Sequence, residues 1–262
     1  MKTLRLWVVM MTEVVLLQIV MTKRSLLPMY CQPSPSTKLD LYITIHLALT
    51  FLKMGRSTIA TRIGVNGFGR IGRIALRANY ENPKVEIIAI NDPNPIEQLA
   101  YLLKYDTTHG KFKGKVTHDA TTISIDGKKI HYYMERDPAK LPWKEHKIDL
   151  VFESTGVFTD KESASAHLTA GAKRVMITAP AKNVDATFAY GVNHETFDPE
   201  KHIIFSNASC TTNCLAPMAK VLHKHFKIRH GLMTTIHATT NDQRTLDLPH
   251  KERQKEECNK KA

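Results

Sequence analysis

The residues of this chain best suited to chemistry lie in the run Ser206-Asn207-Ala208-Ser209-Cys210-Thr211-Thr212-Asn213-Cys214. The apolar run 202–205 before it predicts a strand, and the helical spacing of apolar residues in 215–222 predicts a helix. Cys210 is therefore expected at a helix N-terminus, where unpaired N–H groups and the dipole favour an anion. A thiol placed there loses its proton more easily, and the thiolate is the nucleophilic form. The alternative is a small buried cysteine that only packs, and the polar neighbours on both sides argue against it.

A cysteine nucleophile needs a base to hold its thiolate and to move protons. His237 directly follows the apolar run 232–236, which predicts another strand. Because strand ends meet at one edge of a sheet, Cys210 and His237 could come within hydrogen-bond reach. The alternative is a histidine that caps a strand as an ordinary surface group.

A second motif, Gly67-Phe68-Gly69-Arg70-Ile71-Gly72, matches the pattern Gly-x-Gly-x-x-Gly between a predicted strand and a predicted helix. In such a loop Gly67 permits the tight turn, Gly69 lets the backbone approach a pyrophosphate, and Gly72 lets helix and strand pack closely. Asp92 follows the next predicted strand, where an acid accepts hydrogen bonds from a ribose hydroxyl and repels a 2′-phosphate. These features favour NAD over NADP. The alternative is a glycine-rich turn with Asp92 capping the following helix.

From Thr61 onwards, short β-branched apolar runs alternate with segments of helical spacing, the pattern of βαβ units. Asp126-Gly127 between two of these runs is a strong hairpin signal. The predicted strands are 62–66, 85–90, 122–125, 129–133, 150–153, 175–178, 187–192, 202–205 and 231–238, and the predicted helices before Cys210 are 71–80, 95–105 and 162–169. The expected fold class is therefore α/β, with a Rossmann-type dinucleotide-binding domain.

Charge and cysteine content narrow the function classes. The formal net charge is +12. Residues 1–60 hold seven basic and two acidic residues, and residues 251–262 hold five basic and three acidic ones. The body of the chain, residues 61–250, therefore carries a net charge of only +5. No basic run interleaved with aromatic residues occurs there, so we expect no nucleic-acid partner and no membrane partner. The four cysteines form no disulfide framework, which favours a reduced, cytoplasmic location. No metal-ligand spacing is present, and we expect no metal site.

The two ends of the chain differ from its body. The apolar run 6–20 superficially suggests a signal peptide, but Glu13 interrupts it and it is shorter than the ~20 residues of a membrane helix. We interpret residues 1–60 as a poorly ordered extension translated from upstream of a true start at Met54. A genuine targeting segment is the alternative. Residues 252–262 are highly charged without an apolar stripe, and we expect them to be disordered or a frayed helix.

Four runs together resemble the glyceraldehyde-3-phosphate dehydrogenase family: Arg62-Ile63-Gly64-Val65-Asn66-Gly67-Phe68-Gly69-Arg70-Ile71-Gly72, Glu153-Ser154-Thr155-Gly156-Val157-Phe158, Ser206–Pro217, and Thr234-Thr235-Ile236-His237-Ala238. The resemblance runs continuously from about Thr61 to Lys251. It implies an NAD-binding domain over 61–208 and the beginning of a truncated α+β catalytic domain over 209–251. Residues 1–60 and 252–262 then lie outside the family.

The resemblance also implies a glycolytic mechanism and a set of site residues. Cys210 would attack the aldehyde of glyceraldehyde 3-phosphate, and His237 would activate the thiol and assist hydride transfer to NAD. Inorganic phosphate would then cleave the thioester to give 1,3-bisphosphoglycerate. The implied substrate contacts are Ser209, Cys210, Thr211 and Thr240; the implied cofactor contacts are Gly67, Gly69, Arg70, Ile71, Gly72, Asp92, Arg136 on the adenine side, and Thr178 near the nicotinamide half.

The resemblance stops abruptly after 248–251, inside the segment that in the family lines the neighbouring subunit's cofactor site. We interpret 252–262 as the product of a frameshift or premature stop, which predicts weak or no turnover and puts the homotetramer of the family in doubt. Two alternatives stay open: a catalytically inactive fragment that still binds NAD through 61–208, and erythrose-4-phosphate dehydrogenase, which the sequence separates poorly.

Overall fold

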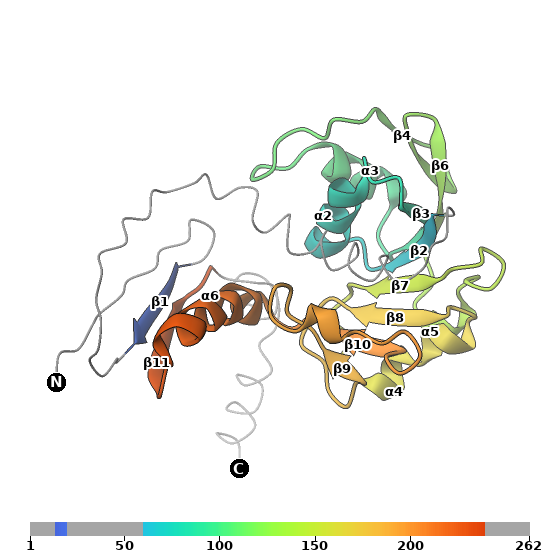
Figure 1. Ribbon diagram of the computed structural model, residues 1–262. Helices are drawn as coiled ribbons and strands as arrows, with labels where there is room; N and C mark the ends of the chain where they lie inside the picture. Colours follow the sequence, from blue (N-terminus) through green and yellow to red (C-terminus); the bar gives the residue numbers. More distant parts are fainter. Residues whose placement is uncertain (1–13, 20–59, 239–262) are drawn as a thin grey trace, which may run out of the picture. The chain divides into compact units, whose positions relative to one another are not determined.

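The computed structural model describes residues 14–19 and 60–238 (Figure 1). These residues form two compact units. The smaller unit contains 14–19 and 222–238, and the larger unit contains 60–221. The predictions for the rest of 1–60, for Thr240 and for 252–262 fall outside the described ranges.

The larger unit is built on a nine-stranded sheet with the order β4-β5-β6-β3-β2-β7-β8-β10-β9. All neighbours from β6 to β9 are parallel, and β4 and β5 add an antiparallel edge. The strands are β2 (Thr61–Asn66), β3 (Val85–Asn91), β4 (Val116–His118), β5 (Thr122–Ile125), β6 (Lys128–Tyr133), β7 (Leu150–Glu153), β8 (Arg174–Ile177), β9 (Ala186–Thr187) and β10 (Ile204–Ser206). In chain order, β2, β3, β6, β7, β8 and β10 have the 3-2-1-4-5-6 arrangement of the dinucleotide-binding fold. The predicted Rossmann-type fold is confirmed.

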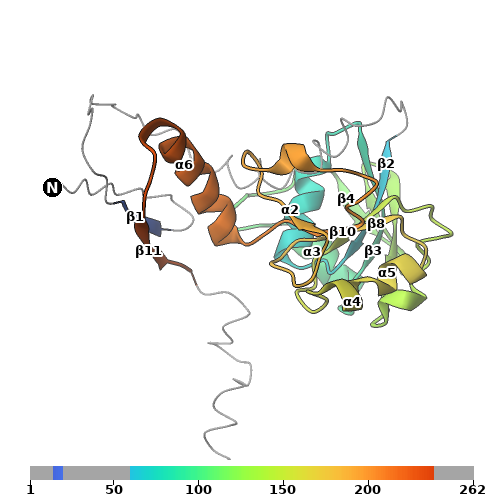
Figure 2. The ribbon, with the colours of Figure 1, turned by 60° about the horizontal axis from the view of Figure 1, so that its bottom comes forward.

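Helices cover both faces of this sheet, as Figures 1 and 2 show. The helices α2 (Arg70–Asn79) and α3 (Ile96–Lys104) pack with Val65 and Phe152 in one apolar core. The short helices α4 (Lys161–Ala164) and α5 (Ala166–Thr169) flank a second core that contains Val151. Since adjacent residues of a strand point to opposite faces, Val151 and Phe152 assign the two cores to opposite sides of the sheet. Small 3-10 turns, η3 (Pro138–Lys140) and η4 (His194–Thr196), lie in the connections.

Most predicted elements are present, but the strand predicted over 187–192 is wrong beyond its first residue. β9 ends at Thr187. The N–H groups of Val192 and Asn193 donate to Ala189 O, and Asn193 Oδ1 accepts from Ala189 N–H at 2.8 Å. Gly191, with a φ of +76°, completes a turn there. The Phe188 N–H still donates to Ser206 O at 2.8 Å, but the N–H groups of Ala189, Val192 and Asn193 are used in local hydrogen bonds, so the chain turns away from β10.

The chain then enters the 17-residue helix α6 (Cys210–Phe226), followed by β11 (Gly231–Ile236). Both elements are present where the sequence predicts them, but β11 ends at Ile236 rather than at Ala238. β11 pairs in antiparallel register with β1 (Val14–Ile19). The β-branched and apolar sequence of β1 suits a strand, and the order of the N-terminal extension as a whole stays a prediction.

Candidate functional site

The glycine loop follows β2, next to β7, at the point where the strand order of the sheet reverses. Gly67 has a φ of +87°, and a Cβ there would lie 2.6 Å from Thr155 N. At Gly72 a Cβ would lie 2.3 Å from Gly67 O and 3.2 Å from Val65 Cγ1. Both positions therefore exclude a side chain, one because of the turn and the other because α2 lies against β2.

Gly69 is exposed and faces open space: no described atom lies within 4 Å of its Cβ position. It precedes α2, whose first turn contains no acidic residue. Helix N-termini of this kind attract phosphate groups. Arg70 and Ile71 open the helix, and Ile71 is 45% exposed. Arg70 Nη1 lies 3.2 Å from Asp106 Oδ2, which holds the guanidinium beside the loop.

Asp92 is buried and joins the loop to the end of β3. Its Oδ2 accepts the Phe68 N–H at 2.8 Å, and its Oδ1 accepts the backbone and side-chain N–H groups of Asn94 at 3.0 and 2.7 Å. Two carboxylate oxygens offer about four acceptor positions, so Oδ2 retains capacity for a ribose hydroxyl. Tyr132 donates to Asp92 O at 2.7 Å. Burial, followed by the charges of Asp92 and Glu97, raises the pKa of Tyr132 and keeps this donor protonated.

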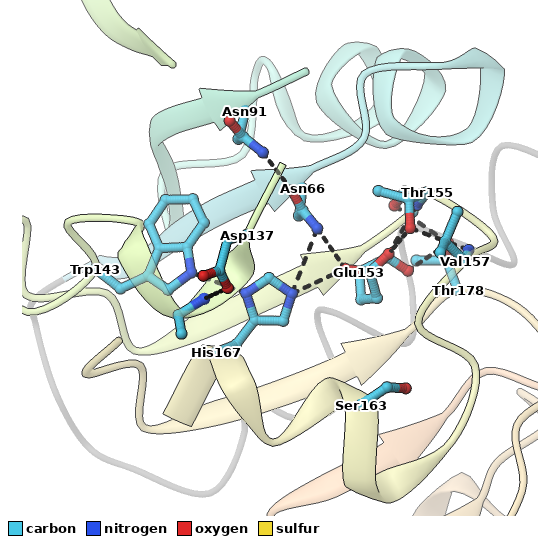
Figure 3. Close-up of polar contacts among 12 residues, drawn as sticks. Asn66, Asn91, Asp137, Trp143, Glu153, Thr155, Val157, Ser163, His167 and Thr178 are labelled. Carbon is cyan, nitrogen blue, oxygen red and sulfur yellow. Dashed lines mark hydrogen bonds and ion pairs between the residues drawn. The ribbon is translucent and has the colours of Figure 1, made fainter. Parts of the chain in front are cut away.

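Three polar side chains end the adjacent strands β3, β2 and β7 at the same level of the sheet. Asn66 pairs in register with Asn91 on one side and with Glu153 on the other. Asn91 Nδ2 donates to Asn66 Oδ1 at 2.7 Å, and Asn66 Nδ2 donates to Glu153 Oε2 at 2.6 Å (Figure 3). These hydrogen bonds join the three strand ends that carry the glycine loop, Asp92 and the turn 154–156.

The predicted residues Arg136 and Thr178 lie on segments joined to the same strand ends. Asn91 exchanges two hydrogen bonds with the Glu135 backbone, both 2.8 Å long. They fix the segment that presents the exposed Arg136. Thr178 donates from N and from Oγ1 to Glu153 O, at 2.9 and 3.1 Å.

Cys210 is exposed at the first residue of α6. It follows a constrained turn in which the buried Ala208 has a φ of +59°, unusual for a residue with a side chain. Ser206 Oγ accepts the Ala208 N–H at 3.0 Å, and it donates to Ala179 O at 2.7 Å. The turn is thereby anchored to the segment after β8.

The hydroxyl groups beside Cys210 have structural partners. Ser209 Oγ accepts the Thr212 N–H at 2.9 Å, the geometry of a helix N-cap. The buried Asn213 donates from Nδ2 to Asn207 O and to Ser209 O, at 2.7 and 3.0 Å. Thr211 Oγ1 lies 4.0 Å from Cys210 Sγ. Ser209, Cys210 and Thr211 therefore lie together at the start of α6, with Ser209 also capping the helix, and their contacts with substrate stay a prediction.

His237 directly follows β11, as predicted, and belongs to the smaller unit. Its Nδ1 lies 2.7 Å from Ala238 O, an acceptor, so Nδ1 is the donor and Nε2 is the basic nitrogen of the neutral ring. Cys210 belongs to the larger unit, so their pairing stays a prediction.

The sequence interpretation missed Asn66, Asn91 and Glu153 as a group. The signal was present, because each is a polar residue that ends a buried strand. Among residues 14–19 and 60–238, no group of three or more His, Cys, Asp or Glu side chains could hold a metal ion. Within the same ranges, no helix combines the length and the apolar character needed to span a membrane.

Comparison with known families agrees with this geometry. The model of the glyceraldehyde 3-phosphate dehydrogenase NAD-binding domain matches residues 61–161, and that of the C-terminal domain of the same family matches 209–261. The second match extends past Lys251 into the segment expected to lie outside the family. The domain boundaries stay predictions.

Glyceraldehyde-3-phosphate dehydrogenases of known organisms are similar over the same region. That of Geobacillus stearothermophilus is 54% identical over 194 residues, covering 74% of this chain and 58% of the relative. Glyceraldehyde-3-phosphate dehydrogenase 2 of Streptomyces avermitilis is 56% identical over 192 residues, covering 73% and 57%. The chain thus spans less than two thirds of the length of these curated relatives. Its two family-model matches and these identities show that the chain belongs to the glyceraldehyde-3-phosphate dehydrogenase family, a family of NAD-dependent oxidoreductases.

Proposed function

We propose that this chain binds NAD at the carboxyl ends of β2, β3, β7 and β8, and that it acts in the phosphorylating oxidation of glyceraldehyde 3-phosphate. One observation carries the proposal. The loop Gly67–Gly72 and Cys210 follow parallel strands of the same sheet, so a nucleotide loop and an exposed thiol lie at one sheet edge. A nucleophile and a cofactor site are thereby provided at the same edge.

The residues present fit a dinucleotide. Gly69 leaves the approach to the N-terminus of α2 open, Arg70 supplies positive charge, and Asp92 retains acceptor capacity for a ribose hydroxyl. Arg136 would lie on the adenine side and Thr178 near the nicotinamide half, as the family resemblance implies. NAD, when bound, supplies the hydride acceptor.

The protein's own residues would perform the remaining chemistry. His237 Nε2 would take the thiol proton, the Cys210 thiolate would attack the aldehyde carbon, and His237 would return that proton to the resulting alkoxide. As the carbon then loses hydride, His237 Nε2 would take the proton of the hydroxyl back. A thioester on Cys210 results. Inorganic phosphate then displaces the thiolate to give the acyl phosphate, with Ser209, Thr211 and Thr240 as the proposed phosphate contacts. The cytoplasmic location and the homotetramer of the family remain predictions from the sequence.

Two measurements test the proposal. Calorimetric titration with NAD is expected to show one site per chain. NADH absorbance is followed with the protein in molar excess over NAD and with glyceraldehyde 3-phosphate added, so that a single hydride transfer per chain can be detected. C210S should abolish NADH formation, whereas C214S, one helical turn further along α6, should retain it. NADH formation that survives in C210S would overturn the assigned nucleophile.

A further inference from the structure

Glu153 is a buried carboxylate that the proposed chemistry does not use. It ends β7 and is 1% exposed. A buried charge of this kind is costly unless hydrogen bonds and partners compensate it. Its partners therefore indicate what the carboxylate does.

Both carboxylate oxygens of Glu153 are occupied. Oε2 accepts from Asn66 Nδ2 at 2.6 Å and from His167 Nε2 at 2.8 Å. Oε1 accepts the Thr155 N–H at 2.8 Å and also the Thr155 hydroxyl. Figure 3 shows this arrangement, with Asn66 and His167 on one side of the carboxylate and Thr155 on the other. One oxygen thus faces the protein interior, and the other holds the turn that follows β7.

His167 presents an N–H to this carboxylate because of its second neighbour. Trp143 Nε1 lies 3.0 Å from His167 Nδ1. An indole N–H only donates, so Nδ1 must be the acceptor. The proton of the neutral ring is then on Nε2, directed at Glu153. Trp143 and His167 are both fully buried, which fixes the orientation of the imidazole.

The turn held by Glu153 lies directly against the glycine loop. A Cβ on Gly67 would meet Thr155 N at 2.6 Å and Ser154 O at 2.8 Å, and the Ser154 N–H donates to Asn66 O at 2.7 Å. The backbone oxygen of Glu153 also accepts both donors of Thr178. One residue therefore fixes the turn on one side of the carboxyl edge and Thr178 on the other.

We propose that Glu153 is a positioning residue for the cofactor: its carboxylate, oriented by His167 and Asn66, holds Thr155, and its backbone oxygen holds Thr178, where both receive the nicotinamide half of NAD. This inference rests on the proposed function, because it takes NAD as the ligand of this edge. It assigns Glu153 no contact with substrate and no part in the chemical step.

The decisive variant is Glu153→Gln, which keeps the size of the side chain. A carboxamide has one acceptor oxygen and one NH₂ group. Whichever way it turns, the NH₂ group faces donors, either Thr155 or the pair Asn66 and His167. Glu153→Asp keeps the carboxylate but shortens its reach, so it should give partial rescue. Glu162→Gln, on the exposed surface of α4, is the matched control.

The affinities for NAD and for AMP are measured by calorimetry. Comparing them distinguishes an effect of Glu153 on the nicotinamide side from damage to the whole nucleotide site. AMP engages only the adenosine side. We expect E153Q to raise the NAD Kd about tenfold, which is about 1.4 kcal/mol, with the AMP Kd changed less than twofold. E153D should lie between wild type and E153Q, and E162Q should match wild type. Equal changes in both constants, or no change in either, would overturn the proposal.

Hydrogen exchange of the ligand-free chain provides a measurement independent of NAD. The Thr155 amide, which donates to the carboxylate, should exchange about tenfold faster in E153Q. The Thr178 amide, which donates to the Glu153 backbone oxygen, and amides in the middle of α2 should keep their wild-type rates. Unchanged exchange at Thr155 would overturn the positioning role. If the wild-type chain binds no NAD, the proposed function fails, and the exchange rates still decide whether Glu153 holds this turn.

Discussion

Trp143 Nε1 donates a hydrogen bond to Nδ1 of His167 at 3.0 Å, in a region where both side chains are fully buried. The indole belongs to the apolar core on the face of α4 and α5. A Cβ at Gly64 would lie 3.0 Å from its ring, so the glycine admits the tryptophan beneath β2. The core tryptophan thereby selects the tautomer that His167 presents to Glu153.

Trp143→Phe should remove this selection and destabilise the fold. The smaller ring leaves a cavity, and His167 Nδ1 loses its only donor among the hydrogen bonds described above. We expect a loss of about 2–4 kcal/mol in the free energy of unfolding, measured with urea. The ¹⁵N resonances of His167 in the wild type should show a protonated Nε2 and an unprotonated Nδ1. A wild-type spectrum with the proton on Nδ1 would contradict the hydrogen-bond assignment.

Alanine variants of two loop glycines should affect different properties: one the free energy of unfolding, the other the affinity for NAD. Gly72→Ala puts a methyl group 2.3 Å from Gly67 O, so α2 must move off β2. We expect a loss of at least about 2 kcal/mol in urea unfolding. Gly69→Ala meets open space and should change stability by less than about 0.5 kcal/mol. Its Kd for NAD should nevertheless rise about tenfold or more, because the methyl group occupies the approach to the helix N-terminus.

The paired design makes each result informative. Normal NAD affinity in G69A would show that no phosphate approaches this part of the backbone. Normal stability in G72A would show that the contact between α2 and β2 is looser than the structure has it. Circular dichroism of both variants checks that the secondary structure is retained.

Local features of the site were predictable from sequence, and long-range ones were not. The glycine loop and the helix start at Cys210 rest on neighbouring residues, so their patterns were sufficient. The contact of Asn66 with Glu153 joins residues 87 positions apart. It depends on β2 pairing with β7, which requires the strand order. The turn after Thr187 was missed for a similar reason, because the Asn193 side chain, not the apolar pattern, decides where β9 ends.

Ser209 is expected to contribute to stability as well as to the proposed phosphate contact. Its Oγ caps α6 through the Thr212 N–H. Ser209→Ala should therefore lower the free energy of unfolding by about 1 kcal/mol. Thr211→Ala, two residues along and with no capping bond among the described residues, should change it by less than about 0.5 kcal/mol. Equal losses in the two variants would contradict the cap.

Asp106 contacts Arg70 of the cofactor loop, and its ionisation is expected to make the free energy of unfolding depend on pH. Burial alone would raise its pKa, but hydrogen bonds from the backbone of His109 and Thr108, the charge of Arg70 and the His109 side chain together lower it to about 2. The unfolded chain protonates Asp at about pH 3.9. The stabilisation from the ionised carboxylate is therefore fully present above pH ~4 and is lost as the pH falls through the folded pKa.

Asp106→Asn, which resembles the protonated carboxyl group, should reveal this contribution directly. At pH 7 the wild type should exceed the variant by about 2 kcal/mol in urea unfolding. The difference should shrink between pH 4 and pH 2, because the wild-type carboxylate becomes protonated there while the amide does not titrate. Asp137→Asn, at an exposed carboxylate, is the matched control. A difference between wild type and D106N that stays constant down to pH 2 would show that the loss comes from packing rather than from charge.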